Sequence, residues 1–247
     1  MSQSSQLYNN IAPLRNVQAF LELVDRLENR GQGLPGMGCF YGPSGFGKTT
    51  ASLFSANQVQ ACAVQMKSVW TQKTLCQKIC EELSLSPART VADMVEQIAE
   101  ALAREDIPLF IDEAGFLVKR NMVEIVRDIY ESSFVPVILI GEELLPQKLA
   151  KWERVHGRIL SWIAAEPCDD QDFALLQHIR CPGIEIEPPL VERMKKSSRG
   201  SARRIVENLE LAREIAALRN LDRVGMTEWG SRAFFTGVAP DPRRISA

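Results

Sequence analysis

The run Gly42-Pro43-Ser44-Gly45-Phe46-Gly47-Lys48-Thr49 constrains the possible folds of this chain more than any other feature of its sequence. A short apolar stretch at 38–41 leads into the run, and a stretch with helical character at 48–57 leaves it. Its glycines let backbone N–H groups approach phosphate oxygens closely and adopt unusual dihedral angles. In such a loop the lysine reaches the β- and γ-phosphates, and the hydroxyl residue ligates magnesium. The run therefore predicts a strand, a phosphate-binding turn and a helix that together hold ATP and Mg²⁺.

Individual residues of this loop have different expected roles. Lys48 is expected to contact the phosphates during catalysis, and Thr49 is expected to bind the metal. Four fixed positions recur by chance in roughly one random chain per hundred, so the context of the run decides its meaning. Nucleotide contacts are expected from the whole loop: Gly42, Pro43, Ser44, Gly45, Phe46, Gly47, Lys48, Thr49 and Thr50.

A second element with matching chemistry follows some 60 residues later. Residues 107–111 are apolar throughout, which is typical of a strand buried on both faces of a parallel sheet. Asp112 and Glu113 follow directly, where Asp112 would join the metal site and Glu113 would polarise the attacking water. The alternative is a buried strand that ends in two solvated acids. The upstream loop favours the catalytic interpretation.

Apolar stretches and helical patterns alternate along the first two thirds of the chain. This alternation predicts an α/β fold with a doubly wound parallel sheet. Strands are expected at 38–41, 61–66, 107–111, 135–140 and 159–163. The expected organisation is an N-terminal helix and arm at 1–33, an α/β core at 34–167, a helical lid at 168–221 with helices near 170–180, 189–198 and 201–219, and a loosely ordered tail at 222–247.

Length and composition exclude several classes of protein. With 247 residues, of which 45% are hydrophobic, the chain can bury a substantial core, so disorder of the whole chain is not expected. No apolar run approaches the roughly 18 to 20 residues of a membrane helix, and residues 1–5 lack the pattern of a signal peptide. A cytoplasmic protein without membrane contact is expected. The six cysteines and two histidines are too scattered for a zinc site, so reduced structural thiols are expected.

Charge is unevenly distributed along the chain. Residues 192–247 carry 12 Lys and Arg against 7 Asp and Glu, whereas the residues before them carry 17 against 24. A basic segment attached to an acidic body permits contact with nucleic acid or with an acidic partner. An ordinary solvated helical face is an equal alternative.

With the loop at 42–49 and the acids at 112–113, the chain resembles the AAA+ ATPases over roughly residues 10–220. Within them it resembles the phage Mu transposition protein B family, whose relatives are TnsC- and IstB-type transposition ATPases. The resemblance implies a P-loop AAA+ core with a small helical lid. It also implies that Arg203, in the motif at 200–204, contacts the γ-phosphate as a second sensor. A solvated arginine is the alternative.

The same resemblance implies an arginine finger supplied by a neighbouring subunit, which can be worth roughly 10³ to 10⁵ in rate. Arg154 and Arg158 lie just before the fifth expected strand, where such a finger would sit. Arg154 is slightly preferred, and a structural salt bridge is an equal alternative for either residue. A finger from the neighbour would make ATP binding and homo-oligomer assembly interdependent.

Two features depart from the family pattern. Glu142 and Glu143 follow the strand at 135–140, where the family usually carries a neutral polar sensor. Because an acid near the γ-phosphate is unfavourable, Glu142 is expected either to face away or to slow turnover. The phage Mu protein also has an N-terminal DNA-binding domain, whereas only about 35 residues precede the first strand here. DNA contact is then expected from the ATPase assembly itself.

The first candidate for DNA contact is the segment 67–73, with Lys67 and Lys73, and the second is Lys119-Arg120. Contacts from lysine and arginine to phosphate give sequence-independent affinity that falls with salt. Solvated basic residues are the alternative, and for Trp70 a core position is favoured. Partner contacts are also possible in the lid and tail, at Arg193, Lys195, Lys196, Arg199, Trp229, Phe234, Phe235, Arg243 and Arg244, although packing of the tail aromatics onto the lid is at least as strong an interpretation.

Together these features predict an ATPase that assembles on double-stranded DNA when ATP is bound, as a ring or filament, and presents that DNA to a transposase. Hydrolysis removes the γ-phosphate that the subunit interface senses, so the assembly is expected to come apart. A helicase loader that grips a helicase or single strands is the nearest alternative. A signalling or secretion-associated ATPase without DNA binding is the alternative from another class.

Overall fold

The computed structural model describes residues 14–239, which divide into two compact units. The first unit ends at Glu166 and the second begins at Pro167. The arm expected at 1–13 and the tail residues Arg243 and Arg244 lie outside the described residues.

The first unit is built on a five-stranded sheet in the order β2-β3-β4-β1-β5. Every neighbouring pair of strands is parallel, which confirms the predicted α/β doubly wound sheet. Both β3 and β4 are buried at every residue, as expected for strands covered on both faces. The five strands are β1 (Met37–Tyr41), β2 (Cys62–Gln65), β3 (Leu109–Asp112), β4 (Val137–Gly141) and β5 (Ile159–Ala164).

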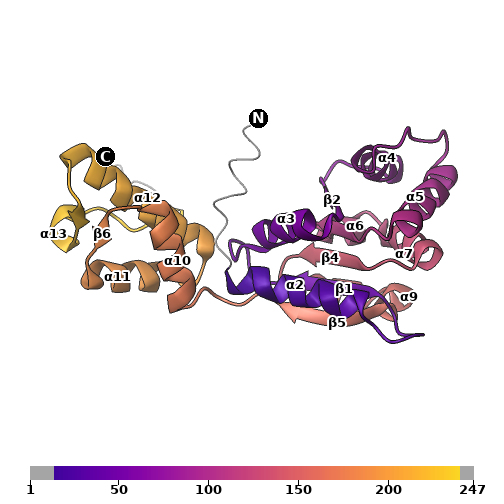
Figure 1. Cartoon of the computed structure of the whole chain (residues 1–247), viewed down its shortest axis with the longest axis horizontal. Helices are drawn as coiled ribbons and strands as arrows, with labels where there is room; N and C mark the ends of the chain where they lie inside the picture. Colours follow the sequence, from indigo (N-terminus) through magenta and orange to yellow (C-terminus); the bar gives the residue numbers. More distant parts are fainter. Residues whose placement is uncertain (1–13, 240–247) are drawn as a thin grey trace, which may run out of the picture. The chain divides into compact units, whose positions relative to one another are not determined.

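Helices cover both faces of this sheet (Figure 1). On one face, α2 (Arg15–Glu28) packs against α3 (Lys48–Val59), and Phe20 of α2 meets Phe40 and Phe110 edge to face, with ring centroids 5.2 and 5.1 Å apart. On the other face, the buried side chains of three helices join the alternate strand residues in one core. Side chains of a strand point alternately to its two faces, so a single strand supplies both layers. The three helices are α4 (Gln72–Glu82), α5 (Val91–Glu105) and α7 (Val123–Ser133).

Three short helices in the first unit are not predicted from the sequence. One follows β3, and two lie between β4 and β5. Each has only four or five residues, which is too few to show a helical period. They are α6 (Gly115–Lys119), α8 (Leu145–Leu149) and α9 (Glu153–His156).

The second unit contains the three helices expected after Pro167. They are α10 (Asp170–Arg180), α11 (Pro188–Ser198) and α12 (Ala202–Arg219). Asp169 starts α10 with a capping box, because its carboxylate accepts the N–H groups of Gln171 and Asp172. Both α10 and α11 pack against α12. A short parallel pair, β6 (Glu185–Ile186) with β7 (Arg223–Val224), adds a small sheet that the sequence does not predict.

The loosely ordered tail predicted from residue 222 is wrong for the described part of it. After β7, residues 226–229 form α13 (Met226–Trp229), and Trp229 is fully buried. Its ring stacks on Phe234 at a centroid distance of 4.6 Å. The buried side chain of Asn208 in α12 bonds both the N–H and the carbonyl of Phe235. The tail is therefore held by its aromatic side chains and by one buried amide, whose hydrogen bonds a glycine- and proline-rich composition does not reveal.

Five of the six cysteines are buried, and these five are free thiols. Burial raises the pKa of Cys76 to about 11 and that of Cys62 to about 12, so their thiolate forms are disfavoured. Within residues 14–239, no helix combines the length and apolar character needed to cross a membrane.

Candidate active site

The phosphate loop leaves β1 at Gly42 and enters α3 at Lys48. Gly42 has a φ of 156°, and a Cβ there would lie 3.0 Å from the Cβ of Ala165, so only glycine fits this close approach. Gly47, the residue before α3, has a φ of 81°. The left-handed backbone at this position turns the chain from loop to helix, which explains why the sequence places glycine there.

The lysine of the loop folds back onto it. Lys48 Nζ donates hydrogen bonds to the carbonyl oxygens of Gly42 and Pro43, each at 2.8 Å. The ammonium group therefore lies inside the curve of the loop, where the phosphates of a nucleotide are expected. Nucleotide contacts by the remaining loop residues stay a prediction.

Four carboxylates act electrostatically on the Lys48 ammonium group. Burial lowers the pKa of Lys48, while the carboxylates of Asp112, Glu113, Glu142 and Glu143 oppose that shift. All of these residues come from the carboxyl ends of β3 and β4 or from the turns after them. Parallel strands end at one edge of the sheet, so the topology brings the two acidic pairs to the loop.

Thr49 and Asp112 are in direct contact. The Thr49 hydroxyl donates to Asp112 Oδ2 at 2.7 Å, and Asp112 Oδ1 accepts the N–H of Glu113 at 2.7 Å. Asp112 is only 7% exposed. Gln65, at the end of β2, reaches the same Oδ2 at 3.5 Å, a contact that sequence reasoning missed. The strand-end position of Gln65 is the one signal that points to it.

This pair of oxygen donors fits a magnesium ion. Magnesium prefers hard oxygen ligands, and usually takes one or two protein groups together with phosphate oxygens and water. The Thr49 hydroxyl and the Asp112 carboxylate supply two such groups side by side. Within residues 14–239, no group of three or more His, Cys, Asp or Glu side chains could hold a metal by itself. The donor set therefore suits an ion that arrives with a nucleotide.

Glu113 occupies a strained and partly buried position. Its φ of 54° lies in the left-handed region, which costs a non-glycine residue on the order of 1 kcal/mol or more. Burial raises the pKa of its carboxyl group, Asp112 and Glu142 raise it further, and Lys48 lowers it. Strain together with a raised carboxyl pKa is common at functional sites. Its role in activating water stays a prediction.

Glu142 is exposed at the end of β4. Its charge nevertheless acts on both Lys48 and Glu113. Of the two expectations for Glu142, that it faces away or that it slows turnover, this electrostatic effect favours the second. Glu142 belongs to the electrostatic environment of the site.

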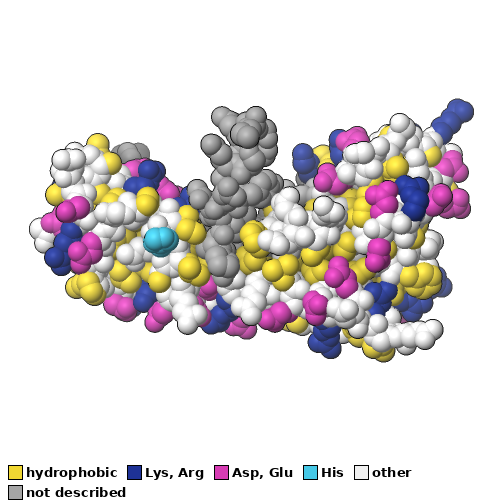
Figure 2. Space-filling view, viewed as in Figure 1, with side chains coloured by type: hydrophobic (Ala, Val, Ile, Leu, Met, Phe, Trp, Pro, Cys, Tyr) yellow, Lys and Arg dark blue, Asp and Glu magenta, His cyan; other side chains and the backbone are white. Residues whose placement is uncertain are grey.

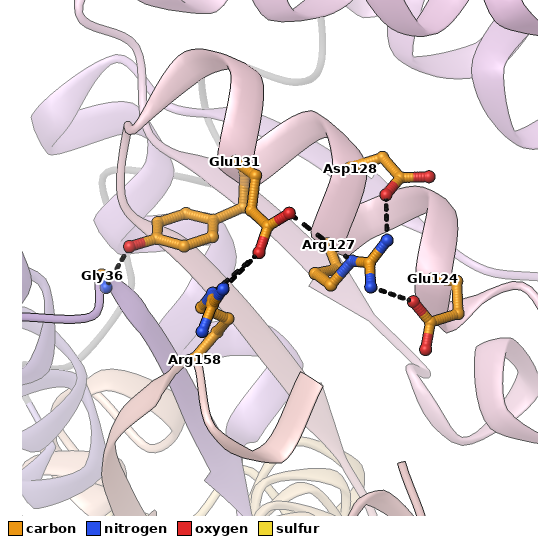
Figure 3. Close-up of polar contacts among 7 residues, drawn as sticks. Gly36, Glu124, Arg127, Asp128, Glu131 and Arg158 are labelled. Atoms are coloured by element: carbon orange, nitrogen blue, oxygen red, sulfur yellow. Dashed lines mark hydrogen bonds and ion pairs between the residues drawn. The ribbon is translucent and has the colours of Figure 1, made fainter. Parts of the chain in front are cut away.

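The two arginine-finger candidates differ in their contacts. Arg158 precedes β5, and Glu131 of α7 accepts a hydrogen bond from its Nε at 2.8 Å and forms an ion pair with its Nη2 at 2.6 Å (Figure 3). Arg154, in α9, is exposed and makes no ion pair or side-chain hydrogen bond with the described residues. The structural salt bridge weighed for both residues therefore applies to Arg158, whereas Arg154 is available to another molecule.

The second-sensor candidate lies in the second unit. Ser201 caps α12 by accepting the N–H of Arg204, which places Arg203 in the first turn of that helix. Arg203 is exposed, whereas Arg204 is half-buried beside Gly237. A contact from Arg203 to a γ-phosphate stays a prediction.

The two candidate DNA-binding segments lie side by side. The Arg120 guanidinium, just after α6, donates to the carbonyl oxygen of Ser68 in the other segment. Lys67, Lys73 and Lys119 are exposed. Trp70 is half-buried and packs against the core, in line with the interpretation favoured for it. On the face seen in Figure 2, Lys and Arg side chains are interspersed with Asp and Glu side chains, so any basic surface is local.

Comparison with known proteins agrees with this geometry. Residues 32–149 match the AAA_22 family, described as an AAA domain. This match, in a chain with a P-loop fold, supports an ATP-hydrolysing enzyme. The matched segment contains the loop, Asp112 and Glu113. A search of curated proteins finds no match.

Several solved structures share the fold. The ORC1 protein of Aeropyrum pernix, solved in complex with DNA, aligns at a TM-score of 0.62 and 20% identity over 86% of this chain and 62% of its own. Cdc6p of Pyrobaculum aerophilum aligns at 0.62 and 15%, over 85% of this chain and 64% of its own. The RuvB Holliday junction branch migration motor of Thermotoga maritima aligns at 0.57 and 22%, over 86% and 66%.

These similarities establish the α/β P-loop AAA+ fold. The chain spans less than two thirds of the length of each of these three proteins. The narrower resemblance to the phage Mu transposition protein B family stays a prediction.

Proposed function

We propose that this protein binds ATP and Mg²⁺, assembles on double-stranded DNA in the ATP-bound state, and presents that DNA to a transposase. The observation that carries the nucleotide part is the contact between the Thr49 hydroxyl and Asp112 Oδ2, in the same site as the half-buried ammonium group of Lys48. The three proteins with similar folds are described, respectively, as an ORC1 protein in complex with DNA, as Cdc6p and as a Holliday junction branch migration motor. Two of these descriptions concern DNA, which favours a DNA-associated role.

In this proposal the chain's own residues divide the chemistry. The loop N–H groups and Lys48 bind the phosphates, and Thr49 and Asp112 hold Mg²⁺, which supplies charge neutralisation when it is bound. Glu113 orients and deprotonates the attacking water. The edge carries four carboxylates near one lysine, so a negatively charged triphosphate is poorly accommodated without a cation. This imbalance is the physical reason for including Mg²⁺.

Assembly follows from the unpaired finger candidate. Arg154 is exposed and uncommitted within the described residues, so it can reach a nucleotide held by a neighbouring subunit. ATP would then be a component of the subunit interface, and its hydrolysis would weaken that interface. Arg203 would contact the γ-phosphate as a second sensor.

The DNA surface in this proposal is the adjoining pair of segments that carry Lys67, Lys73, Lys119 and Arg120. A single subunit supplies few basic contacts, so binding would be weak. An assembly aligns several copies along the phosphate backbone and gains affinity from multivalency. ATP-dependent assembly would therefore appear as ATP-dependent DNA binding.

The test is fluorescence anisotropy with labelled duplex and single-stranded DNA, in ATP or ADP, together with electron microscopy of the same samples. We expect tight duplex binding and rings or filaments in ATP alone, with affinity falling steeply as salt rises. Lys48→Ala should abolish both. Tight binding to single strands with none to duplex would favour a helicase loader. Negligible DNA binding at low salt, with nucleotide binding intact, would favour a signalling or secretion-associated ATPase.

Individual DNA contacts are tested by single substitutions. Lys67→Ala and Lys119→Ala should each reduce the dependence of log affinity on log salt by about 0.9 for every phosphate that the substituted lysine no longer neutralises. Lys151→Ala is the matched control, because Lys151 is also exposed in the first unit but lies outside both segments. An equal effect of all three substitutions would remove the assigned surface.

The transposition role is tested separately. A purified transposase added to ATP- and ADP-loaded complexes on duplex DNA should direct strand transfer to the bound DNA only with ATP. Equal strand transfer with and without the protein would contradict the transposition role and leave the nucleotide site intact.

A further inference from the structure

The side chain of Asn16 joins the phosphate loop to the end of the first unit. Its Nδ2 donates to the carbonyl oxygen of Phe46 in the loop at 2.8 Å, and to that of Glu166 at 2.8 Å. Its Oδ1 accepts the N–H of Glu166 at 2.9 Å. Three segments far apart in sequence therefore meet at one amide group, contributed by the second residue of α2.

This amide is buried, and both its nitrogen and its oxygen form hydrogen bonds. Asn16 is only 5% exposed, so its polar atoms cannot be satisfied by bulk water. A buried polar group that loses its partners costs more than a net hydrogen bond is worth, and the unpaired carbonyl oxygens share that cost. The geometry of the Phe46 carbonyl is therefore constrained.

A second contact holds the loop against the same part of the chain. The N–H of Ala165 donates to the carbonyl oxygen of Tyr41 at 2.6 Å, and the Cα of Gly42 lies against Ala165 with no room for a side chain. Both ends of the loop, at Gly42 and at Phe46, are thus fixed to residues 165–166. The chain enters the second unit immediately afterwards, at Pro167.

We propose that Asn16 is a positioning residue that holds the phosphate loop in its binding conformation and links the loop's nucleotide state to residues 165–167. The carbonyl of Phe46 and the N–H of Gly47 belong to the same planar peptide unit. Fixing the carbonyl therefore fixes the direction of an N–H group in the loop that surrounds the phosphates. Movement of the loop upon nucleotide binding would be transmitted through one rigid amide to the last residue of the first unit.

This inference rests on the nucleotide binding proposed above, and it does not depend on DNA or on a transposase. It differs from a purely structural role in one respect. A structural residue would lower stability without selectively changing nucleotide affinity. A positioning residue changes nucleotide affinity beyond what the loss of stability explains.

The test compares two buried asparagines in the whole chain. Asn208, in α12, is also buried, and its amide also bonds backbone groups far away in the sequence, those of Phe235. Both Asn16→Ala and Asn208→Ala should lower the melting temperature. Only Asn16→Ala should weaken the binding of a fluorescent ATP analogue, by about tenfold, the factor that corresponds to roughly 1.4 kcal/mol. Equal nucleotide affinities of the two variants at a temperature where both are folded would overturn the proposal.

Asn16→Asp provides a second variant that keeps the shape of the side chain. Its carboxylate keeps the acceptor for the Glu166 N–H but faces the carbonyl oxygens of Phe46 and Glu166 without a proton to donate. Its nucleotide affinity relative to the wild type should be reduced at neutral pH and should recover in part as the pH falls, because the protonated acid can donate one of the two lost hydrogen bonds. A ratio that does not change with pH would contradict the assigned hydrogen bond.

Hydrogen exchange tests the link to residues 165–167. Addition of the ATP analogue should slow exchange of the amides at 163–168 in the wild type and in Asn208→Ala, and this response should disappear in Asn16→Ala at saturating nucleotide. An unchanged response in Asn16→Ala would overturn the link. Failure of the wild type to bind the analogue at all would instead contradict the proposed function.

Discussion

The two edges of the parallel sheet in the first unit differ in whether their charged side chains form ion pairs. Near the amino edge, Arg158 pairs with Glu131 at the end of α7, and along the same helix Arg127 forms ion pairs with Glu124, Asp128 and Glu131 (Figure 3). At the carboxyl edge, Lys48 bonds carbonyl oxygens, and no carboxylate of the described residues lies within ion-pair distance of it. The charges near the amino edge are paired within the chain, whereas in the described residues at the carboxyl edge four carboxylates act on Lys48 without forming an ion pair with it.

This difference indicates that the ion pairs contribute to stability, whereas the carboxyl edge contributes to function. The strained backbone at Glu113 and the excess of negative charge both destabilise the fold at the carboxyl edge. Sites with such costs are common where a ligand completes the electrostatics. We therefore expect substitutions at the carboxyl edge to change activity, and substitutions among the amino-edge ion pairs to change stability.

The largest expected effect comes from Arg154, the amino-edge arginine without a partner in the described residues. Arg154→Ala should lower the rate of ATP hydrolysis by the assembled protein by about 10³-fold or more, because a trans-acting arginine stabilises transition-state charge. Arg158→Ala should leave this rate nearly unchanged. Steady-state hydrolysis assays check both variants.

A mixing experiment distinguishes a finger from an arginine acting within its own subunit. Arg154→Ala and Lys48→Ala are each expected to be inactive, but a mixture of the two can form sites with an intact lysine from one subunit and an intact arginine from the next. Recovery of hydrolysis in the mixture is expected. Absence of recovery, with assembly retained, would assign Arg154 another role.

The next effect concerns the carboxyl edge itself. Glu113→Gln should lower kcat by about 10²- to 10⁴-fold, because a positioned general base contributes that much, while ATP affinity remains similar. Single-turnover hydrolysis and analogue binding measure the two quantities. Normal hydrolysis by Glu113→Gln would mean that another group activates the water.

A smaller effect should appear in the pH dependence. The negative charge of Glu142 raises the pKa of Glu113, so Glu142→Gln should lower that pKa. The base is active when deprotonated, so the acid limb of the kcat profile should move to lower pH. Glu143→Gln is the control, because Glu143 acts on Lys48 but not on the Glu113 carboxyl. Identical profiles for wild type and Glu142→Gln would contradict the assignment of Glu113 as the titrating base.

The smallest effect belongs to the paired charges. Glu131→Gln removes the partner of Arg158 and one partner of Arg127, and should lower the free energy of unfolding by about 1 kcal/mol or less, since these side chains are partly exposed. Hydrolysis should be unchanged. Glu105→Gln, which breaks the exposed pair with Arg104, should have no measurable effect on urea denaturation. A large loss of activity in Glu131→Gln would contradict the expectation that these ion pairs affect stability and not activity.

Local sequence determined much of this protein. Glycine at positions 42, 45 and 47 permits one kind of loop, and unbroken apolar strands such as 107–111 require a sheet covered on both faces, so the P-loop and the parallel α/β fold could be predicted. Short-range chemistry could not reveal α6, α8 and α9, which have too few residues for a periodic pattern. It also could not reveal the packed tail, because burial of Trp229 depends on Phe234 and on the surrounding helices.

Tertiary structure alone decided which side chains meet. Asn16 and Glu166 are 150 residues apart, and Gln65 and Asp112 are 47 apart, so no pattern along the chain could join them. Likewise, the sequence favours Arg154 over Arg158 only slightly as the finger, and it is the contact of Arg158 with Glu131 on α7 that distinguishes the two residues. Periodicity and loop composition specify helices, strands and turns because they act over a few residues. Hydrogen bonds and ion pairs between these elements depend instead on how the elements pack together in the fold.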